Sequence, residues 1–296
     1  MAIDKKGQIT PKAKIGIIGG SGLYEMEGLT NIVEVKARTP FGEPSDAIVI
    51  GEIQGNKIAF LPRHGRGHFI NPTEIPVRAN IYALKSLGVE WIISINAVGS
   101  LKENIHPLDI VIPDQLIDRT KSRVNTFFEK GIAAHPLFAD PFCSPLSELL
   151  CKAAKEAGAK VHKGGTYVVM EGPSFSTRAE SNLYRSWKAD IIGMTALPEA
   201  KLAREAEICY ASLSCVTDYD CWHESEESVT IEMVIGNLKR NAETAKRIIG
   251  LVAESIPDKR DCPCAEALKN AIITDPSKIT AKMKRELALL IGKYIK

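Results

Sequence analysis

At positions 209–222 the chain reads CYASLSCVTDYDCW. The first eight residues are small, apolar or β-branched, a pattern typical of a strand buried on both faces of a parallel sheet. Two carboxylates, Asp218 and Asp220, follow this strand directly. Because ligands of open α/β sheets bind at the carboxyl ends of the strands, both acids lie where a functional site is expected. A single Asp there would be interpreted as a helix cap, but two acids flanking the aromatic Tyr219 favour a ligand site.

The overall composition is that of an ordinary globular protein. Of the 296 residues, 45% are apolar and 25% are charged, both usual values. The formal net charge of +2 is too small to indicate nucleic acid or an anionic membrane as a partner. Residues 1–6 lack the apolar segment of a signal peptide, and no later run approaches the length of a membrane span. We therefore expect a cytoplasmic protein without nucleic-acid or membrane partners.

Five of the seven cysteines fall into two groups. Cys151, Cys209 and Cys215 lie in apolar segments and are interpreted as small core residues. The motif Cys262-Pro263-Cys264 lies in a polar tail, where it is compatible with a strained disulfide, half of a metal site or chance. No second Cys or His pair lies at zinc spacing along the chain, so no metal site is predicted.

Short apolar runs alternate with helical periodicity, which predicts an α/β protein. Strands are expected over residues 14–18, 47–53, 57–61, 91–95, 110–112, 166–170, 190–193 and 209–216. Helices are expected over residues 71–87, 144–157, 177–187, 198–206, 230–256 and 279–295, with a long loop over 118–143. The simplest organisation is a single α/β domain over 1–256, followed over 257–296 by the Cys-Pro-Cys tail and a helical extension.

Several of the expected strands end in residues suited to a ligand site. These are Ser21, Arg63-His64, Asn96-Ala97 and Met194-Thr195, in addition to the two acids. The Gly-rich turn around Ser21 breaks the G-x-G-x-x-G pattern of dinucleotide folds, so it is either a plain tight turn or a cradle for a single phosphate. The hydroxyls of Ser21 and Thr195, together with Arg63 and His64, form one half of the expected site, which is suited to bind an anion. The carboxylates and an aromatic ring form a second half, suited to a flat base that carries N–H donors.

The motifs over residues 16–23, 63–66, 96–100, 171–176, 193–195 and 217–222 together resemble the trimeric purine nucleoside phosphorylases. Within that family the match is to the branch that acts on 5'-methylthioadenosine, and it covers residues 13 to 256. The resemblance implies a phosphorylase/hydrolase-like three-layer fold, with a mixed, mostly parallel central sheet flanked by helices. It also implies phosphorolysis of a purine N-glycosidic bond, with inorganic phosphate as co-substrate and no other cofactor.

The resemblance assigns roles to individual residues. Phosphate contacts fall to Ser21, Arg63, His64, the backbone at Asn96 and Ala97, and Thr195. Substrate contacts fall to Met194 under the ribose, Asp218 at N7 of the base, Asp220 and Ser176 near its 6-position, and Tyr219. Phe175 is either core or a stacking platform. Two positions depart from many animal-type members, since Asn96 and Ser21 both replace Thr.

Asp218 also predicts which purine is cleaved. A carboxylate accepts hydrogen bonds from a 6-amino group, whereas a 6-oxo group would set oxygen against oxygen. The branch that prefers 6-oxo purines has Asn at this position, so Asp218 predicts adenine. To donate a proton at neutral pH, Asp218 needs a pKa raised by burial or by a proton shared with Asp220.

The start of the helix expected over 230–256 is interpreted as the reader of the 5'-substituent. Ile231, Val234 and Ile235 share one helical face, and in the resembling branch this face abuts the 5'-methylthio group, although ordinary core packing is equally compatible. By the same resemblance His135 reaches the pocket of a neighbouring subunit, which implies a homotrimer or a dimer of trimers.

The resulting prediction is phosphorolysis of 5'-methylthioadenosine to adenine and 5-methylthioribose 1-phosphate, in purine and methionine salvage. A broader adenosine or purine nucleoside phosphorylase is the alternative. A nucleoside hydrolase and an NAD-dependent oxidoreductase are more distant alternatives, which phosphate omission and cofactor binding would distinguish.

Overall fold

The structure is a computed structural model that describes residues 11–20, 23, 25, 27–129, 131–223 and 231–295. Eleven strands of the described part form one mixed sheet. The strands are β1 (Ile15–Gly19), β2 (Thr30–Val35), β3 (Ile48–Ile53), β4 (Asn56–Pro62), β5 (Trp91–Ser100), β6 (Ile110–Ile112), β7 (Gln115–Arg119), β8 (Val161–Lys163), β9 (Thr166–Met170), β10 (Ile191–Gly193) and β11 (Cys209–Asp218). The α-helices are α1 (Val77–Ser86), α2 (Ser144–Glu156), α3 (Arg178–Ser186), α4 (Ala196–Glu205), α5 (Ile231–Ser255), α6 (Ala281–Glu286) and α7 (Ala288–Ile291).

The sheet is organised around β5 and β11. The main strand order is β2-β3-β4-β1-β5-β10-β9-β7, while β11 pairs with β5 and β6, and β6 pairs with β8. β5 runs parallel to β1 and β11, and its last two residues, Gly99 and Ser100, pair antiparallel with β10. All ten residues of β11 are buried, as expected for a strand covered on both faces. The prediction of a mixed, mostly parallel sheet is therefore confirmed.

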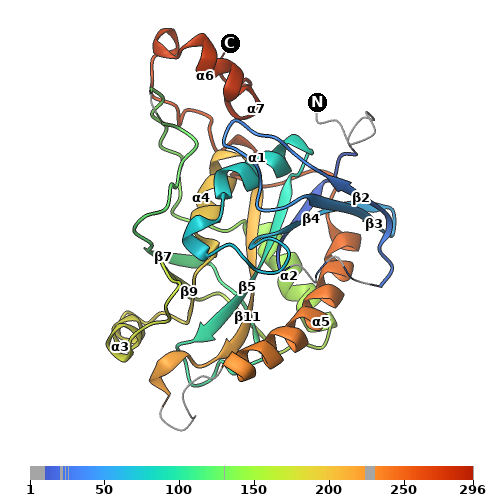
Figure 1. Cartoon of the computed structure of the whole chain (residues 1–296), viewed down its shortest axis with the longest axis vertical. Coiled ribbons are helices and arrows are strands. Elements are labelled where there is room, and N and C mark those ends of the chain that lie inside the picture. Colours follow the sequence, from blue (N-terminus) through green and yellow to red (C-terminus); the bar gives the residue numbers. More distant parts are fainter. Residues whose placement is uncertain are drawn as a thin grey trace.

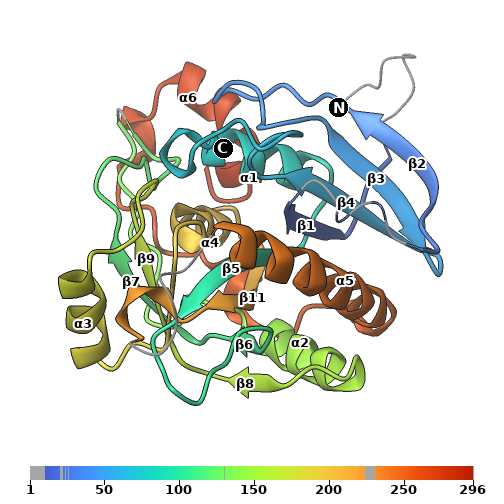
Figure 2. The same ribbon diagram turned by 60° about the horizontal axis from the view of Figure 1, so that its bottom comes forward.

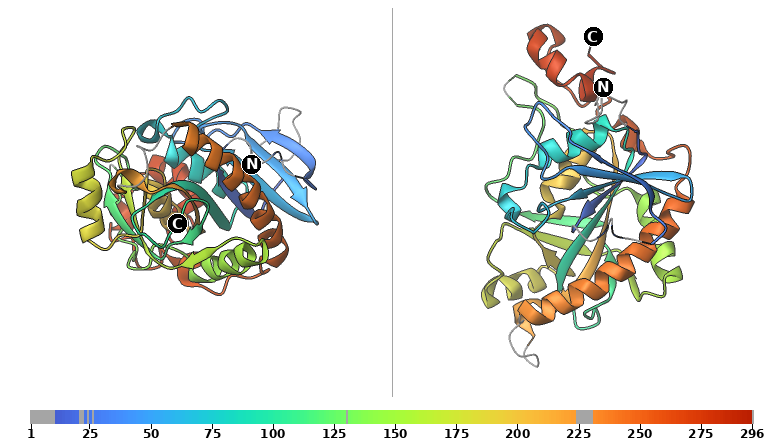
Figure 3. Two further views of the ribbon diagram at one scale, coloured as in Figure 1. Left: turned by 90° about the horizontal axis from the view of Figure 1, so that it is seen from below. Right: turned by 45° about the vertical axis from the view of Figure 1, so that its right-hand side comes forward.

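Helices cover both faces of this sheet, which gives the expected three layers (Figure 2). On one face, Ile81 and Leu84 of α1 and Leu202 of α4 belong to one core cluster. On the other face, Leu150 of α2 and Ile248 of α5 belong to a second cluster. Figures 1 and 3 show α5 lying along the outside of the sheet beside β11.

Two expected helices are interrupted. The helix expected over 71–87 begins as a 3₁₀ turn at Pro72–Glu74 and restarts as α1 at Val77. Pro76 accounts for the break, because proline lacks an N–H group and disfavours helical geometry in the residue before it. The helix expected over 279–295 is replaced by the short helices α6 and α7, which meet at the buried Leu287.

The C-terminal tail packs against the main body rather than standing apart from it. Leu268, Leu290 and Ile291 belong to the same core cluster as α1 and α4. Ala134, in the loop over 120–143, forms an isolated β-bridge with Ile272 of the tail. Within the described ranges, no helix combines the length and the apolar character needed to cross a membrane.

Candidate active site

The two acids of the 209–222 stretch lie beside an irregularity in the pairing of β11. The register of β11 against β5 shifts between Val216 and Asp218, so that Asp218 pairs with Gly99. A bulge of this kind bends the strand and re-aims the side chains that follow it. Two amides of α5 hold the bulged backbone: Asn241 donates to the carbonyl of Val216 at 3.0 Å and Asn237 to that of Thr217 at 2.7 Å.

The carboxylates of Asp218 and Asp220 lie close together and are nearly buried. They are 8% and 9% exposed. Asp218 accepts hydrogen bonds from the Thr217 hydroxyl at 2.6 Å and from the backbone N–H of Asp220 at 2.8 Å. Asp220 has a φ of 55°, in the left-handed region. A side chain at Gly99 would place its Cβ 3.0 Å from Asp218 Oδ1, so this position favours glycine.

Burial raises the pKa of Asp220 to about 6, and the neighbouring charge of Asp218 also raises it. A carboxyl group with this pKa is partly protonated near neutral pH. When one of the two carboxyl groups is protonated, the pair presents one O–H group that donates a hydrogen bond and three oxygens that accept hydrogen bonds. This combination suits a heterocycle with adjacent donor and acceptor atoms.

The anion-binding half is built around Arg63, which follows β4 and is 3% exposed. Its guanidinium donates to both carboxylate oxygens of Glu199, to the Ser94 hydroxyl at 2.7 Å and to the carbonyl oxygens of Ile18 and Ile95. One of the two Nη1 hydrogens has no acceptor among the described residues. Arg63 is thus held rigidly by the protein and keeps one donor for a ligand.

Asn96 and Thr195 are joined by their side chains. The expected strand over 91–95 continues to Ser100, so Asn96 lies in mid-strand, and its side chain is 1% exposed. Its amide donates to the Ser212 hydroxyl, and its oxygen accepts from the Thr195 hydroxyl, each at 2.7 Å. Ala97, the next residue of this central strand, is exposed. An exposed residue in mid-sheet marks an open space on the Ala97 face of β5.

His64 presents a neutral ring. Its Nδ1 lies 2.8 Å from the carbonyl oxygen of Ile70, so in the neutral ring Nδ1 carries the proton and Nε2 is an acceptor. Burial and the charge of Arg63 lower the pKa of His64 to about 4. The ring stacks on His68 with centroids 4.2 Å apart. Such a ring can accept a hydrogen bond from the hydroxyl group of a protonated phosphate.

Met194 and the 171–176 segment lie against one another. Gly172 has a φ of 70°, and a Cβ built there would lie 2.5 Å from the Met194 sulfur. The Ser176 carbonyl accepts from the Cys221 thiol at 3.2 Å, which ties this segment to the acids. Phe175 is 66% exposed, so the core interpretation of this residue is wrong in the single chain.

The other predicted site residues lie outside the described residues or away from the acids. Ser21 and the side chains of Ile231 and Val234 lie outside the described residues. Ile235 is 47% exposed. His135 is exposed, and its N–H donates to the carbonyl of Ala271 in the tail. The structure thus places His135 with the tail and not with the acids of its own chain.

Sequence reasoning missed three supporting groups. Glu199 is 1% exposed and anchors Arg63, and the pair Asn237 and Asn241 holds the bulge. Arg123, in the loop over 120–143, donates to the carbonyls of Met194, Leu197 and Glu171. The two Asn residues at i and i+4 on an apolar helix were a visible signal, whereas Glu199 and Arg123 resembled ordinary surface charges.

The two halves of the site share strand β5. Ala97 lies at the anion-binding half and Gly99 beside the acids, and two residues of a strand span about 7 Å. This separation suits a ligand with an anion at one end and a base at the other. The fold and the site define a phosphorylase, and a family model described as the phosphorylase superfamily matches residues 14–254. The chain belongs to this family.

Individual relatives are more specific. The chain is 58% identical to the S-methyl-5'-thioadenosine phosphorylase of Geobacter sulfurreducens, over 95% of this chain and 99% of the relative. It is 55% identical to the S-methyl-5'-thioadenosine phosphorylase of Koribacter versatilis, over 96% and 97%. A methylthioadenosine phosphorylase sourced from an antarctic soil metagenomic library superposes with a TM-score of 0.92 at 52% identity, covering 95% and 99% of the two chains. A methylthioadenosine phosphorylase from Schistosoma mansoni in complex with adenine gives 0.79 at 35% identity, covering 95% and 98%.

Proposed function

We propose that this chain cleaves S-methyl-5'-thioadenosine with inorganic phosphate, releasing adenine and 5-methylthioribose 1-phosphate. The observation that carries the proposal is the pair of buried carboxylates, Asp218 and Asp220, at the bulged end of β11. Asp218 pairs with Gly99, three residues or about 10 Å along β5 from Asn96, which belongs to the polar network of Arg63, Asn96 and Thr195. The names of the relatives support the same reaction.

In this proposal phosphate binds at the exposed face of Ala97. The remaining Nη1 hydrogen of Arg63, the Ser21 hydroxyl, and backbone N–H groups at Asn96 and Ala97 donate to it. The Thr195 hydroxyl turns from Asn96 to donate to the phosphate as well, and His64 Nε2 accepts a hydrogen bond from the phosphate hydroxyl. Phosphate so held attacks the anomeric carbon of a sugar with oxocarbenium character, as in other glycosidic cleavages. No cofactor beyond phosphate is needed, because the nucleophile also stabilises the developing cation.

Adenine leaves from the acid pair. Asp218 lies at N7 in this proposal, and Asp220 and Ser176 lie near the 6-amino group. The raised pKa of Asp220, about 6, supplies a shared proton close to Asp218, which the leaving base requires. Met194 lies under the ribose, and Tyr219 and Phe175 contact the base. Phe175 is exposed in the chain, so its ring is available to stack.

The remaining assignments concern the 5'-group and the assembly. Ile231, Val234 and Ile235 form the apolar wall that favours a thioether over a hydroxyl. His135 is exposed in its own chain, which fits a role in the pocket of a neighbouring subunit. A homotrimer or a dimer of trimers follows, acting in the cytoplasm in purine and methionine salvage.

Relative specificity constants test the choice of substrate. We expect kcat/KM for S-methyl-5'-thioadenosine to exceed that for adenosine at least about tenfold, the usual discrimination of an apolar pocket. We expect inosine to be slower by roughly 10⁴-fold, because its 6-oxo group leaves buried polar atoms mispaired. Adenosine and methylthioadenosine of equal kcat/KM would support the broader purine nucleoside phosphorylase. A preference for inosine would refute the adenine assignment.

A further inference from the structure

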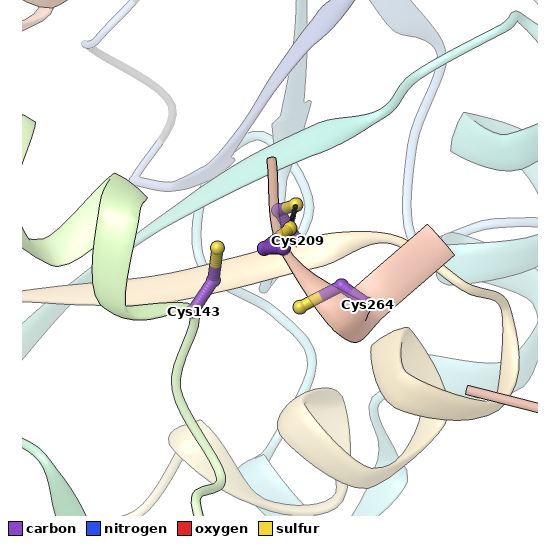
Figure 4. Close-up of side chains that lie close together, drawn as sticks. Cys143, Cys209 and Cys264 are labelled. Carbon is purple, nitrogen blue, oxygen red and sulfur yellow. Dashed lines mark hydrogen bonds between the residues drawn. The ribbon is translucent and has the colours of Figure 1, made fainter. Parts of the chain in front are cut away.

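Four of the seven cysteines meet at the end of β11 opposite the acids. They are Cys143, Cys209, Cys262 and Cys264, and their sulfur atoms all lie within 4.8 Å of one another. Figure 4 shows the sulfur atoms of Cys143, Cys209 and Cys264 pointing toward a common centre. All seven cysteines are free thiols in the structure. The fold therefore supplies the second cysteine pair that spacing along the chain does not reveal.

Three separate segments bring these thiols together. Cys143 ends the loop over 120–143 as the N-cap of α2, and its N–H donates to the carbonyl of Tyr210 at 2.8 Å. Cys209 is the first residue of β11. Cys262 and Cys264 flank Pro263 in the tail, around the start of a 3₁₀ turn. Secondary structure thus fixes two of the thiols, and the tail delivers the other two.

We propose that Cys143, Cys209, Cys262 and Cys264 bind one Zn²⁺ ion in a tetrahedral, structural site. With zinc–sulfur bonds of about 2.3 Å, the sulfurs of such a site lie about 3.8 Å apart. The spacing here brackets that value, with an upper limit of 4.8 Å and Cys209 and Cys262 at 3.3 Å. Four thiolates are the soft donor set that selects zinc over magnesium or calcium.

The surroundings suit the charge of such a site. Binding of Zn²⁺ releases the four thiol protons, so the four thiolates leave the site with net negative charge. Cys143 is the N-cap of α2, and the N-terminus of this helix favours a thiolate there. Cys143, Cys209 and Cys264 are buried while Cys262 is partly exposed, which leaves a route of entry.

Closed coordination by four protein ligands leaves no open position, so the ion stabilises structure and does not take part in catalysis. Cys209 and Asp218 are the first and last of the ten residues of β11, about 30 Å apart along an extended strand. The ion joins the start of β11 to the loop over 120–143 and to the tail. These two segments also pair with each other at Ala134 and Ile272. Zinc therefore adds a second connection between the loop over 120–143 and the tail.

The test measures zinc in the full-length chain, produced in zinc-supplemented medium and purified without chelators. We expect about one zinc per chain by elemental analysis and seven titratable thiols after denaturation with chelator present. Chain refolded with Co²⁺ in place of Zn²⁺ should show the intense visible bands of tetrahedral thiolate coordination. Removal of zinc should lower the Tm by roughly 5–10 °C.

Matched variants assign the ligands. The zinc content of the double variant Cys262→Ser/Cys264→Ser should be at least about tenfold lower than that of the wild type, and the variant should lack the Co²⁺ bands. Cys151→Ser changes a buried cysteine of α2 that lies outside the cluster and should retain both. A zinc content far below one per chain in the wild type overturns the proposal. This holds if all seven thiols titrate, and also if only three titrate because the four cysteines of the cluster have formed two disulfides. The wild-type measurements decide the matter even if the double variant fails to fold.

Discussion

Replacing Asp218 with Asn should reduce kcat/KM for S-methyl-5'-thioadenosine by about 10²–10⁴-fold, the usual contribution of a general acid. The substitution keeps the shape of the side chain, and its remaining oxygen can still accept the N–H of Asp220. The Thr217 hydroxyl, which now donates to Asp218, can turn toward the carbonyl of Val98 and accept from the new amide. The fold should therefore survive while proton donation and the match to a 6-amino group are lost.

The same variant should change the ratio between substrates. An amide at position 218 can donate to a 6-oxo base, so the ratio of kcat/KM for inosine to that for methylthioadenosine should rise. Steady-state kinetics with both substrates measure this ratio, and the loss should fall mainly on kcat. Asp114→Asn is the control, because Asp114 is an exposed turn residue near the Cys209 end of β11. An unchanged substrate ratio in Asp218→Asn would contradict the assigned role.

The second large effect is expected at Glu199. Glu199→Gln removes the only carboxylate that pairs with Arg63 among the described residues and leaves a guanidinium that is 3% exposed without a counter-charge. Breaking one side of a buried ion pair costs about 3–5 kcal/mol. The Ser94 and Tyr210 hydroxyls also donate to Glu199, so their bonds are disturbed as well. Urea denaturation at a fixed protein concentration should show this loss in the free energy of unfolding.

Glu205 provides a matched control on the same helix. It is buried too, but its partners are the Thr126 hydroxyl and the N–H of Phe127, both at 2.7 Å. Burial raises its pKa from 4.5 to about 7, so stability is lost as pH rises from about 4.5 to 7, and Glu205→Gln removes that pH-dependent penalty. At pH 7 the control should therefore leave the free energy of unfolding unchanged or raise it, because the Gln side chain stays neutral. Equal losses in the two variants would refute the special role of the Arg63–Glu199 pair.

Much of the fold was predictable from local patterns. The buried run of β11 and the capping box at Thr177 and Glu180 both appear as expected, the latter with Thr177 accepting from the N–H of Glu180 at 3.2 Å. The helix expected over 71–87 was wrong in its continuity, although Pro76 is a visible signal for the break because proline cannot continue a helix. The division of the tail helix at Leu287 was not predictable, because it follows from packing Leu287 and Leu290 into a core built by distant segments.

The site was predicted as a set of strand ends but not as a network. Strand order and register determine that Asn96 contacts Ser212 and that Arg63 meets Glu199, 136 residues away. Spacing along the chain contains none of this information. The same limitation explains the cysteines: Cys209 was interpreted as a small core residue and Cys143 was not singled out, and only the fold brings them to Cys262 and Cys264.

The central claim is phosphate-dependent cleavage of S-methyl-5'-thioadenosine, and product analysis with and without phosphate tests it most directly. Chromatography of the base and ³¹P NMR of the sugar should find adenine and 5-methylthioribose 1-phosphate in equal amounts. Both should form only when phosphate is present. Full turnover in phosphate-free buffer, with free 5-methylthioribose as the product, would contradict the account.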